Sequence, residues 1–303
     1  MAAAAGASAH RVRLGLTVRR LREVRGMTVR QLSGQVGVSI GTLSAIENGR
    51  VGTSSERLWE LADALGVRAE QLLAGVADPT QDGRWTTVAV APARVEVGSW
   101  RDFPPLDLDP ALSGALSSFL EFGYHGSTMR GIAERAGLSV AGLYHHYAGK
   151  QHLLVSLLDR TMDELVQRTA AAGATSAEPW TRFADLVECQ TLFHSHRREL
   201  GFICATEMRS LAAPARQRIA EVRRGEQARM DAEVIAASRA GVFDTPHPRE
   251  AARAVVTMCT AIPQWYRRDG PSTPEELACR YVDFALDLVR CDPSVRSRRG
   301  AGP

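Results

Sequence analysis

The stretch FGYHGSTMRGIAERAGLSVAGLYHHYAGKQHLL, residues 122–154, decides the fold that we predict for the centre of this chain. Thr128 is a good N-cap for a short helix, and the sequence AGLS at residues 136–139 predicts a turn after that helix. Residues 140–147 then form a second short helix, and Lys150 begins a long one. Two short helices joined by a glycine-containing turn are the arrangement that places the second helix in the major groove of DNA.

A further helix is predicted directly before this stretch, opening at Asp109 or Pro110 and ending at Gly123 and Gly126. Its apolar face is formed by Leu112, Leu116, Phe119, Leu120 and Phe122. Together with the two short helices, it predicts a three-helix DNA-binding head over residues 109–155.

The framework of residues 122–154 closely resembles the helix-turn-helix of the TetR family of regulators. The Gly-Tyr pair before the second helix, the IAxxAG pattern, the LYHHY core and the lysine after it all stand in their expected places. The resemblance implies a homodimer whose two heads bind the halves of a palindromic site in double-stranded DNA. It implies DNA contacts for Thr128, Arg130, Ser139, Val140, Ala141, Gly142, Tyr144, His145 and Lys150.

The chemistry of these positions suits a nucleic acid. Thr128 and Arg130 lie at a helix N-terminus, where backbone amides and the helix dipole favour phosphate. The small residues at 140–142 let the second helix lie close to base edges, and Tyr144 projects from the same helix towards the DNA. For the neighbouring Tyr147, core packing is the favoured interpretation.

A second unit of the same kind is predicted near the N-terminus, in TVRQLSGQVGVSIGTLSAIENGR at residues 28–50. Thr28 and Ser39 are N-cap candidates for its two helices, and glycines break the run between them. With LWELADALGV behind it, the segment resembles the XRE family, the phage-repressor-like helix-turn-helix domains, over Leu14–Leu73. The resemblance implies that the residues facing DNA are Thr28, Ser39, Thr42 and Ser44, with a phosphate contact by Arg50.

The N-terminal unit departs from that family in ways that affect base reading. Val29, Ile40, Gly41 and Ala45 stand where many relatives carry polar residues, and they cannot form the bidentate hydrogen bonds of direct readout. They suit contacts with thymine methyls, while phosphates and DNA shape supply the rest of the binding. The alternative is that this unit has become a protein-interaction module. The arginine-rich run at 11–30 fits either a phosphate-binding face or a solvated one.

From residue 151 to about 291 the pattern stays helical, as in the ligand-binding and dimerisation bundle of the TetR family. Prolines and glycines divide it into predicted helices at 150–172, 179–195, 197–211, 213–241, 247–267 and 274–291. The sequence at 262–289 most resembles the branch that controls lipid, sterol and aromatic-acid breakdown, several members of which sense acyl-CoA thioesters. We therefore favour an effector of that chemistry.

Two sets of residues in this bundle are candidates for contacts with an effector and with a second copy of the chain. The predicted pocket, for which ordinary core packing is the alternative at each position, is lined by Phe183, Val187, Phe193, Phe202, Met208 and Trp265. The last two helices are expected to expose an apolar stripe at the dimer interface, formed by Val255, Met258, Ile262, Tyr281, Phe284 and Leu288. Candidates for holding an anionic effector group, or for pairing with nearby glutamates, are Arg197, Arg198 and Arg209.

Composition argues against several other classes. The 303 residues carry a net charge of +3, and no apolar run reaches the ~18 residues that a membrane span needs. The five cysteines form no CxxC pair and fit reduced core thiols, so we expect a cytoplasmic protein. Neither the histidine spacings nor the motifs predict a metal site, a cofactor or a catalytic residue, and we expect no enzyme.

The sequence therefore predicts an all-α protein in several parts. These are a disordered tail at 1–10, the XRE-like unit at 11–75, a linker at 76–108 with a short strand at 85–91, the TetR-like head at 109–155, the bundle at 156–291 and a tail at 292–303. We predict a DNA-binding repressor that is released when a small-molecule effector enters the bundle. A small-molecule-binding bundle without DNA activity is the alternative from a different class.

Overall fold

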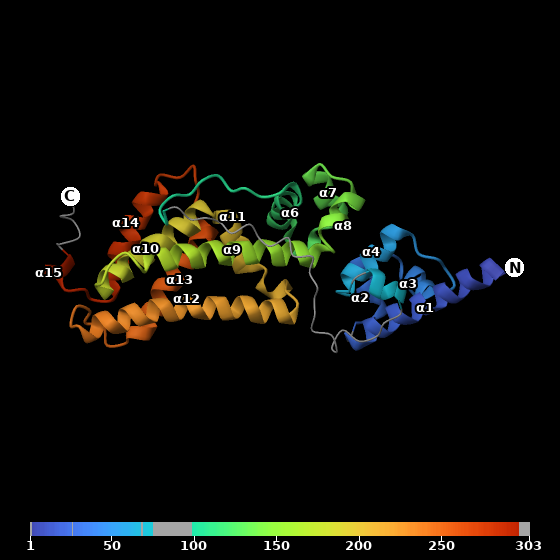
Figure 1. The fold of residues 1–303 in the computed structure, drawn as a ribbon, viewed down its shortest axis with the longest axis horizontal. Coiled ribbons are helices and arrows are strands. Elements are labelled where there is room, and N and C mark those ends of the chain that lie inside the picture. The colour runs from blue at the N-terminus through green and yellow to red at the C-terminus, as the bar shows by residue number, and fades with distance from the viewer. Residues whose placement is uncertain (1, 26, 68, 75–98, 297–303) are drawn as a thin grey trace. The chain divides into compact units, whose positions relative to one another are not determined.

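The computed structural model describes residues 2–25, 27–67, 69–74 and 99–296, and the fold of these residues is all-α, as predicted (Figure 1). An isolated bridge between Phe243 and Cys291 interrupts the helical pattern. The predicted strand at 85–91 lies outside the described residues. None of the described helices is both long enough and apolar enough to span a membrane.

The chain divides into two compact units, residues 1–90 with 141–152 and residues 91–140 with 153–303. The first unit holds α1 (Ala2–Val24), α2 (Val29–Val36), α3 (Ile40–Glu47), α4 (Ser55–Ala64) and α5 (Ala69–Ala74), with most of α8 (Val140–His146) and the first turn of α9 (Lys150–Ala172). Its core is built from α1 to α5 and includes Leu14, Val18, Leu32, Leu43, Ile46, Leu61, Leu65 and Leu72.

The start of α1 differs from the expected disordered tail, because residues 2–10 are helical. Alanine has the highest helix propensity of all residues, so the alanine tract extends the amphipathic helix that follows it. Further along α1, Gly15 lets the helix approach α3 closely, since a Cβ there would collide with the backbone carbonyl of Ile46. At the other end of the chain, α15 (Pro293–Arg296) occupies the start of the predicted C-terminal tail, and residues 297–303 lie outside the description.

The two predicted N-caps of the N-terminal motif are confirmed. Thr28 and Gln31 form a reciprocal capping box at the start of α2, in which the Thr28 Oγ1 accepts the Gln31 N–H at 3.2 Å. The Ser39 Oγ accepts the Thr42 N–H at 3.0 Å and caps α3. Gly37 ends α2 with φ of +67°, a left-handed conformation that favours glycine. Local side chains therefore set both the turn and the two helices around it.

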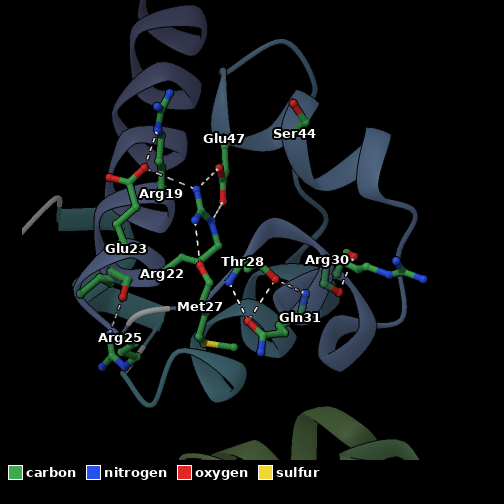
Figure 2. A network of polar contacts seen from close by, with 12 residues as sticks. Arg19, Arg22, Glu23, Arg25, Met27, Thr28, Arg30, Gln31, Ser44 and Glu47 are labelled. Atoms are coloured by element: carbon green, nitrogen blue, oxygen red, sulfur yellow. Dashed lines mark hydrogen bonds and ion pairs between the residues drawn. The ribbon is translucent and has the colours of Figure 1, made fainter.

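A buried ion pair fastens α1 to α3, as Figure 2 shows. The Arg22 guanidinium donates to the two carboxylate oxygens of Glu47 at 2.6 and 3.0 Å, and its side chain is only 9% exposed. It also donates to the backbone carbonyl of Met27 at 2.9 Å. The hydrogen bond to Glu47 raises the pKa of Arg22, against the opposing effect of burial. The pair therefore ties the end of α1 to the loop before α2 and to the end of α3.

The second unit contains the remaining helices. They are α6 (Pro110–Gly126), α7 (Met129–Ala136), most of α9, α10 (Pro179–His196), α11 (Arg198–Thr206), the 3-10 turn η1 (Met208–Ser210), α12 (Ala213–Arg239), α13 (Pro248–Trp265), α14 (Pro274–Leu288) and α15. α10 is central to this unit because it packs against α12, α13 and α14. Asp109 caps α6 by accepting the Leu112 N–H at 2.9 Å, which confirms the predicted start of that helix.

Residues 99–109, at the end of the predicted linker, run along the bundle to the start of α6 (Figure 1). Trp100 is buried in the core of the second unit. Arg168 donates to the carbonyl of Trp100 at 3.1 Å, and Arg197 donates to the carbonyl of Pro104 at 3.0 Å. This part of the predicted linker is therefore fastened to the bundle.

The two arginines share one carboxylate in the interior. Glu164 on α9 accepts from Arg168 at 2.9 Å and from Arg197 at 3.1 Å, and the Glu164 and Arg168 side chains are each 1% exposed. Buried charges are tolerated only when they are paired and hydrogen-bonded. The Glu164–Arg168–Arg197 network, together with the backbone carbonyls of residues 99–104, meets that requirement.

Candidate nucleic-acid interface and effector domain

The local geometry of the second motif follows the predicted pattern. The Thr128 Oγ1 accepts the Gly131 N–H at 3.1 Å and caps α7, so the predicted cap is confirmed. Gly137 ends α7 with φ of +65°, and Leu138 N–H returns to the carbonyl of Ala133 at 2.9 Å. Three residues, 137–139, separate α7 from α8. The chain therefore has the helix–turn–helix order that its sequence predicts.

The predicted DNA-contacting residues of this motif differ in how open they are. The exposed ones are Thr128, Arg130, Ser139, Ala141 and His145. The half-buried ones are Val140, Gly142, Tyr144 and Lys150. Five of the nine therefore present their side chains or backbone to solvent, including both residues at the N-terminus of α7.

An aromatic pair inside the first unit covers one of the half-buried residues. The rings of Trp59 on α4 and Tyr144 on α8 stack with centroids 4.9 Å apart and planes 24° from parallel. Burial raises the pKa of the Tyr144 hydroxyl, and the carboxylates of Asp63 and Glu60 act in the same direction. The stack therefore covers part of Tyr144, which the sequence predicts to face DNA.

A second contact lies one helical turn further along α4. The Asp63 Oδ1 accepts the backbone N–H of Lys150 at 2.9 Å, at the start of α9. Gly149 fits beside this carboxylate, because a Cβ at that position would collide with the Asp63 Oδ1. Burial raises the pKa of Asp63, and the Lys150 charge and N–H partly oppose that shift. Trp59 and Asp63 were not among the predicted site residues; their spacing of four on one helix is the signal that places them on one face.

In the N-terminal motif, two of the residues predicted to contact DNA also interact with each other at the start of α3. The hydroxyls of Ser39 and Thr42 lie 2.8 Å apart at the start of α3, where Ser39 is the cap. Thr28 and Arg50 are exposed, whereas Thr42 and Ser44 are half-buried. Ile40 is an exposed apolar residue at the N-terminus of α3, as the departure from the XRE pattern led us to expect.

The predicted pocket residues do not form one set. Phe183, Val187 and Phe193 are completely buried on α10, while Phe202 and Met208 are half-buried. Trp265 is 52% exposed and stacks near Tyr281, so its placement in an interior pocket is wrong. The physical reason is that α13 ends at Trp265, where the ring turns outward.

The predicted arginine anchors for an anionic group are largely occupied. Arg197 is bound to Glu164, and Arg198 donates to the carbonyl of Tyr266 at 2.6 Å. Arg209 is exposed. An anionic effector group held by Arg197 or Arg198 would have to displace these partners.

The predicted dimer stripe is divided between the inside and the outside of the protomer. Val255 and Ile262 are completely buried, and Tyr281 is 9% exposed, so the expectation that these three are exposed is wrong. They face the protomer's own core, because an apolar helix face covers its neighbours first. Met258 is half-buried, and Phe284 and Leu288 are exposed.

Three families match parts of the chain. "Helix-turn-helix domain" matches residues 13–74, "Bacterial regulatory proteins, tetR family" matches residues 111–157, and "Tetracyclin repressor-like, C-terminal domain" matches residues 176–289. The second match covers α6 from its second residue, α7 and α8, and the third covers α10 to α14.

Named proteins resemble more than half of the chain. The HTH-type transcriptional repressor KstR2 of Mycobacterium tuberculosis is 27% identical over 174 residues, which cover 57% of this chain and 87% of that protein. The HTH-type transcriptional activator FasR of Mycolicibacterium smegmatis is 28% identical over 61% of this chain and 84% of its own length. The structure of AibR in complex with isovaleryl coenzyme A and operator DNA has a TM-score of 0.55 at 23% identity, covering 60% of this chain and 97% of that one.

Proposed function

Because this chain is a TetR-family transcriptional regulator with an additional N-terminal helix-turn-helix domain, we propose that it acts as a homodimeric repressor which a small-molecule effector releases from its operator. The family match identifies a DNA-binding regulator and not an enzyme. The observation that carries the proposal is the capped α7 followed by α8, with Thr128 and Arg130 open to solvent, in the segment that the family match covers. We favour repression because KstR2 is a repressor. FasR is an activator, and activation by this chain would require the same DNA and effector binding with the opposite effect on transcription.

DNA binding is assigned to residues that can meet phosphate or base edges. Thr128 and Arg130 lie at the N-terminus of α7, where the helix dipole favours an anion. His145 and Ala141 are exposed on α8 and face the groove in this assignment. Palindromic operators follow from two heads in one homodimer.

The homodimer is assigned to the apolar surface of α13 and α14. Trp265, Phe284 and Leu288 are large apolar residues that are exposed in the protomer. Exposed apolar groups gathered on terminal helices are typical of an interface between copies. Phe284 is 56% exposed and is the natural centre of such a contact.

The effector is assigned to the acyl-CoA class or a related lipid or aromatic-acid catabolite. Support comes from AibR, whose structure contains isovaleryl coenzyme A, and from KstR2, which is described as a ketosteroid regulator. Effector binding releases DNA if it favours a protomer arrangement with a different spacing of the heads, and a few kcal/mol of differential binding is enough.

Arg130→Ala tests the assigned DNA contact. Loss of one phosphate contact should weaken binding about tenfold and reduce the salt slope of log K by about 1. The duplex is first selected from a random pool. Binding of the full chain to it is then measured at several salt concentrations from about 50 to 200 mM. Arg249→Ala is the matched control, because Arg249 is also an exposed arginine at the second position of a helix, α13. An unchanged affinity and slope for Arg130→Ala would contradict the assignment.

We propose a second role for the N-terminal domain, which is to compete with DNA for α8. The stack of Trp59 on Tyr144 favours this role, because it joins the N-terminal domain to that helix. An aromatic pair contributes roughly 0.5–1.5 kcal/mol, so Trp59→Ala should strengthen DNA binding by about 2- to 10-fold. Trp59→Phe keeps an aromatic ring at the contact and serves as the control. Fluorescence anisotropy with the selected duplex measures the change, and weaker binding by Trp59→Ala would count against competition.

A further inference from the structure

The central helix of the effector domain, α10, carries polar residues on a buried surface. Gln190 is 3% exposed, His194 is 6% exposed, and Thr191 and Ser195 are fully buried. The two hydroxyls are satisfied by their own helix, since Thr191 donates to the carbonyl of Val187 and Ser195 donates to that of Thr191, each at 2.8 Å. These two residues therefore need no outside partner.

The other two polar residues are not satisfied in this way. The Gln190 Oε1 and both ring nitrogens of His194 have no hydrogen-bond partner among the described residues. A buried polar group without a partner is strongly unfavourable, and few native groups are left so. Gln190 and His194 lie four residues apart on one face of α10, so we expect both side chains to contact the same partner.

The backbone of α11 packs closely against the His194 ring, because residue 201 has no side chain. A Cβ at Gly201 of α11 would lie 3.0 Å from the His194 Nδ1 and 2.8 Å from the Pro263 Cγ of α13. Pro263 lies inside α13 and lacks the N–H that would bond the carbonyl of Cys259 one turn earlier. The Cys259 Sγ is 3.7 Å from the Thr191 Oγ1, so this turn of α13 lies beside the polar part of α10.

The charge state of these groups limits the ligand. Burial, and then the positive charge of Arg223, lower the pKa of His194 to about 4, so the ring is neutral at pH 7. A neutral imidazole offers one donor and one acceptor, and a glutamine amide also offers both. A carboxylate has only acceptors and would leave the Gln190 Oε1 without a donor. A hydroxyl or an amide can donate to the Gln190 Oε1 and at the same time accept from the N–H of the His194 ring.

We propose that Gln190 and His194 recognise an uncharged hydroxyl or amide group next to an apolar part of the effector. Phe183 and Val187 precede them at helical spacing on α10, so an apolar surface continues along the same stripe. This proposal rests on the proposed function, because it names the chemistry of the effector. An amide would come from the pantetheine arm of a CoA thioester, and a hydroxyl from the effector's own ring or chain.

Three small probes of one shape test the ligand chemistry on the full chain. They are benzyl alcohol, benzamide and benzoate, which carry a hydroxyl, an amide and a carboxylate on the same ring. We expect benzyl alcohol or benzamide, but not benzoate, to raise the melting temperature of the wild-type protein at pH 7. The neutral probe that gives the larger rise in melting temperature identifies whether the recognised group is a hydroxyl or an amide. Equal rises with benzoate, or none with either neutral probe, would overturn the proposal.

Substitutions link the probe effect to the two side chains. Gln190→Leu and His194→Leu remove unpaired polar atoms, so each should raise the melting temperature of the free protein by roughly 2–4 °C and abolish the rise given by the neutral probe. Ser195→Ala is the matched control and should keep the probe effect, because its hydroxyl is already paired. His194→Asn, a neutral donor and acceptor, should restore part of it.

The outcomes separate this proposal from the proposed function. A fall in melting temperature for both leucine variants, or a retained response to the neutral probe, would show that the two residues are structural. Binding of each variant to the selected duplex is measured in parallel and should equal that of the wild type. A chain that fails to bind any duplex but still responds to the probes as expected would refute DNA regulation and leave the ligand site standing.

Discussion

Glu47→Leu should unfold the N-terminal helix-turn-helix domain while the TetR-like C-terminal domain stays folded. The substitution leaves the Arg22 guanidinium buried with the Met27 carbonyl but without its carboxylate. Breaking one side of a buried pair costs about 3–5 kcal/mol. A domain of this size has a total free energy of unfolding of roughly 3–9 kcal/mol. The expected loss is therefore large enough to unfold much of the population of this domain.

Hydrogen exchange followed by mass spectrometry resolves the two units in one sample. Peptides from α1 to α5 should exchange faster by two orders of magnitude or more, whereas peptides from α10 to α14 should be unchanged. Glu60→Gln is the control, because Glu60 is 40% exposed in its pair with Arg57 in the same domain and contributes at most ~1 kcal/mol.

Removing both partners gives a further check on the cause. The double variant Arg22→Met with Glu47→Leu should regain most of the lost protection, since replacing both members of a buried pair by apolar groups is often neutral. If Glu47→Leu exchanges like the wild type, the pair does not stabilise this domain.

Glu164→Leu should have the corresponding effect on the second unit. It leaves two guanidinium groups, of Arg168 and Arg197, buried without a counter-charge, and the Arg168 side chain is only 1% exposed. A loss of about 3–5 kcal/mol is expected. Because both arginines also hold residues 99–104, this segment should detach from the bundle in the variant.

Urea denaturation followed by the fluorescence of Trp100 measures both effects. To isolate that signal, the other four tryptophans are replaced by phenylalanine, in the reference protein as well. The variant should unfold at lower urea, with a red-shifted emission before the main transition. Asp159→Asn, which removes the partner of the half-exposed Arg218, should shift the free energy of unfolding by less than ~1 kcal/mol. A variant with the wild-type midpoint and a still-buried Trp100 would contradict this account of the network.

The sequence by itself determined the helix-turn-helix motifs and their family. Thr28, Ser39 and Thr128 cap helices within three residues of themselves, and Gly37 and Gly137 end helices through their own positive φ. Such interactions are local, so their residue pattern is visible in the chain before it folds. The all-α fold and the division into an N-terminal motif, a head and a C-terminal bundle follow from the same signals.

Only the tertiary structure decided which side of each helix faces inward and which distant residues meet. The apolar stripe of α13 and α14 gave no sign that Val255 and Ile262 are interior while Phe284 is exposed. The stack of Trp59 on Tyr144 joins residues 85 positions apart, and no periodicity specifies it. Burial without a partner, as for His194, is likewise a property of the packed protein, because only neighbours from other helices can supply or withhold a hydrogen bond.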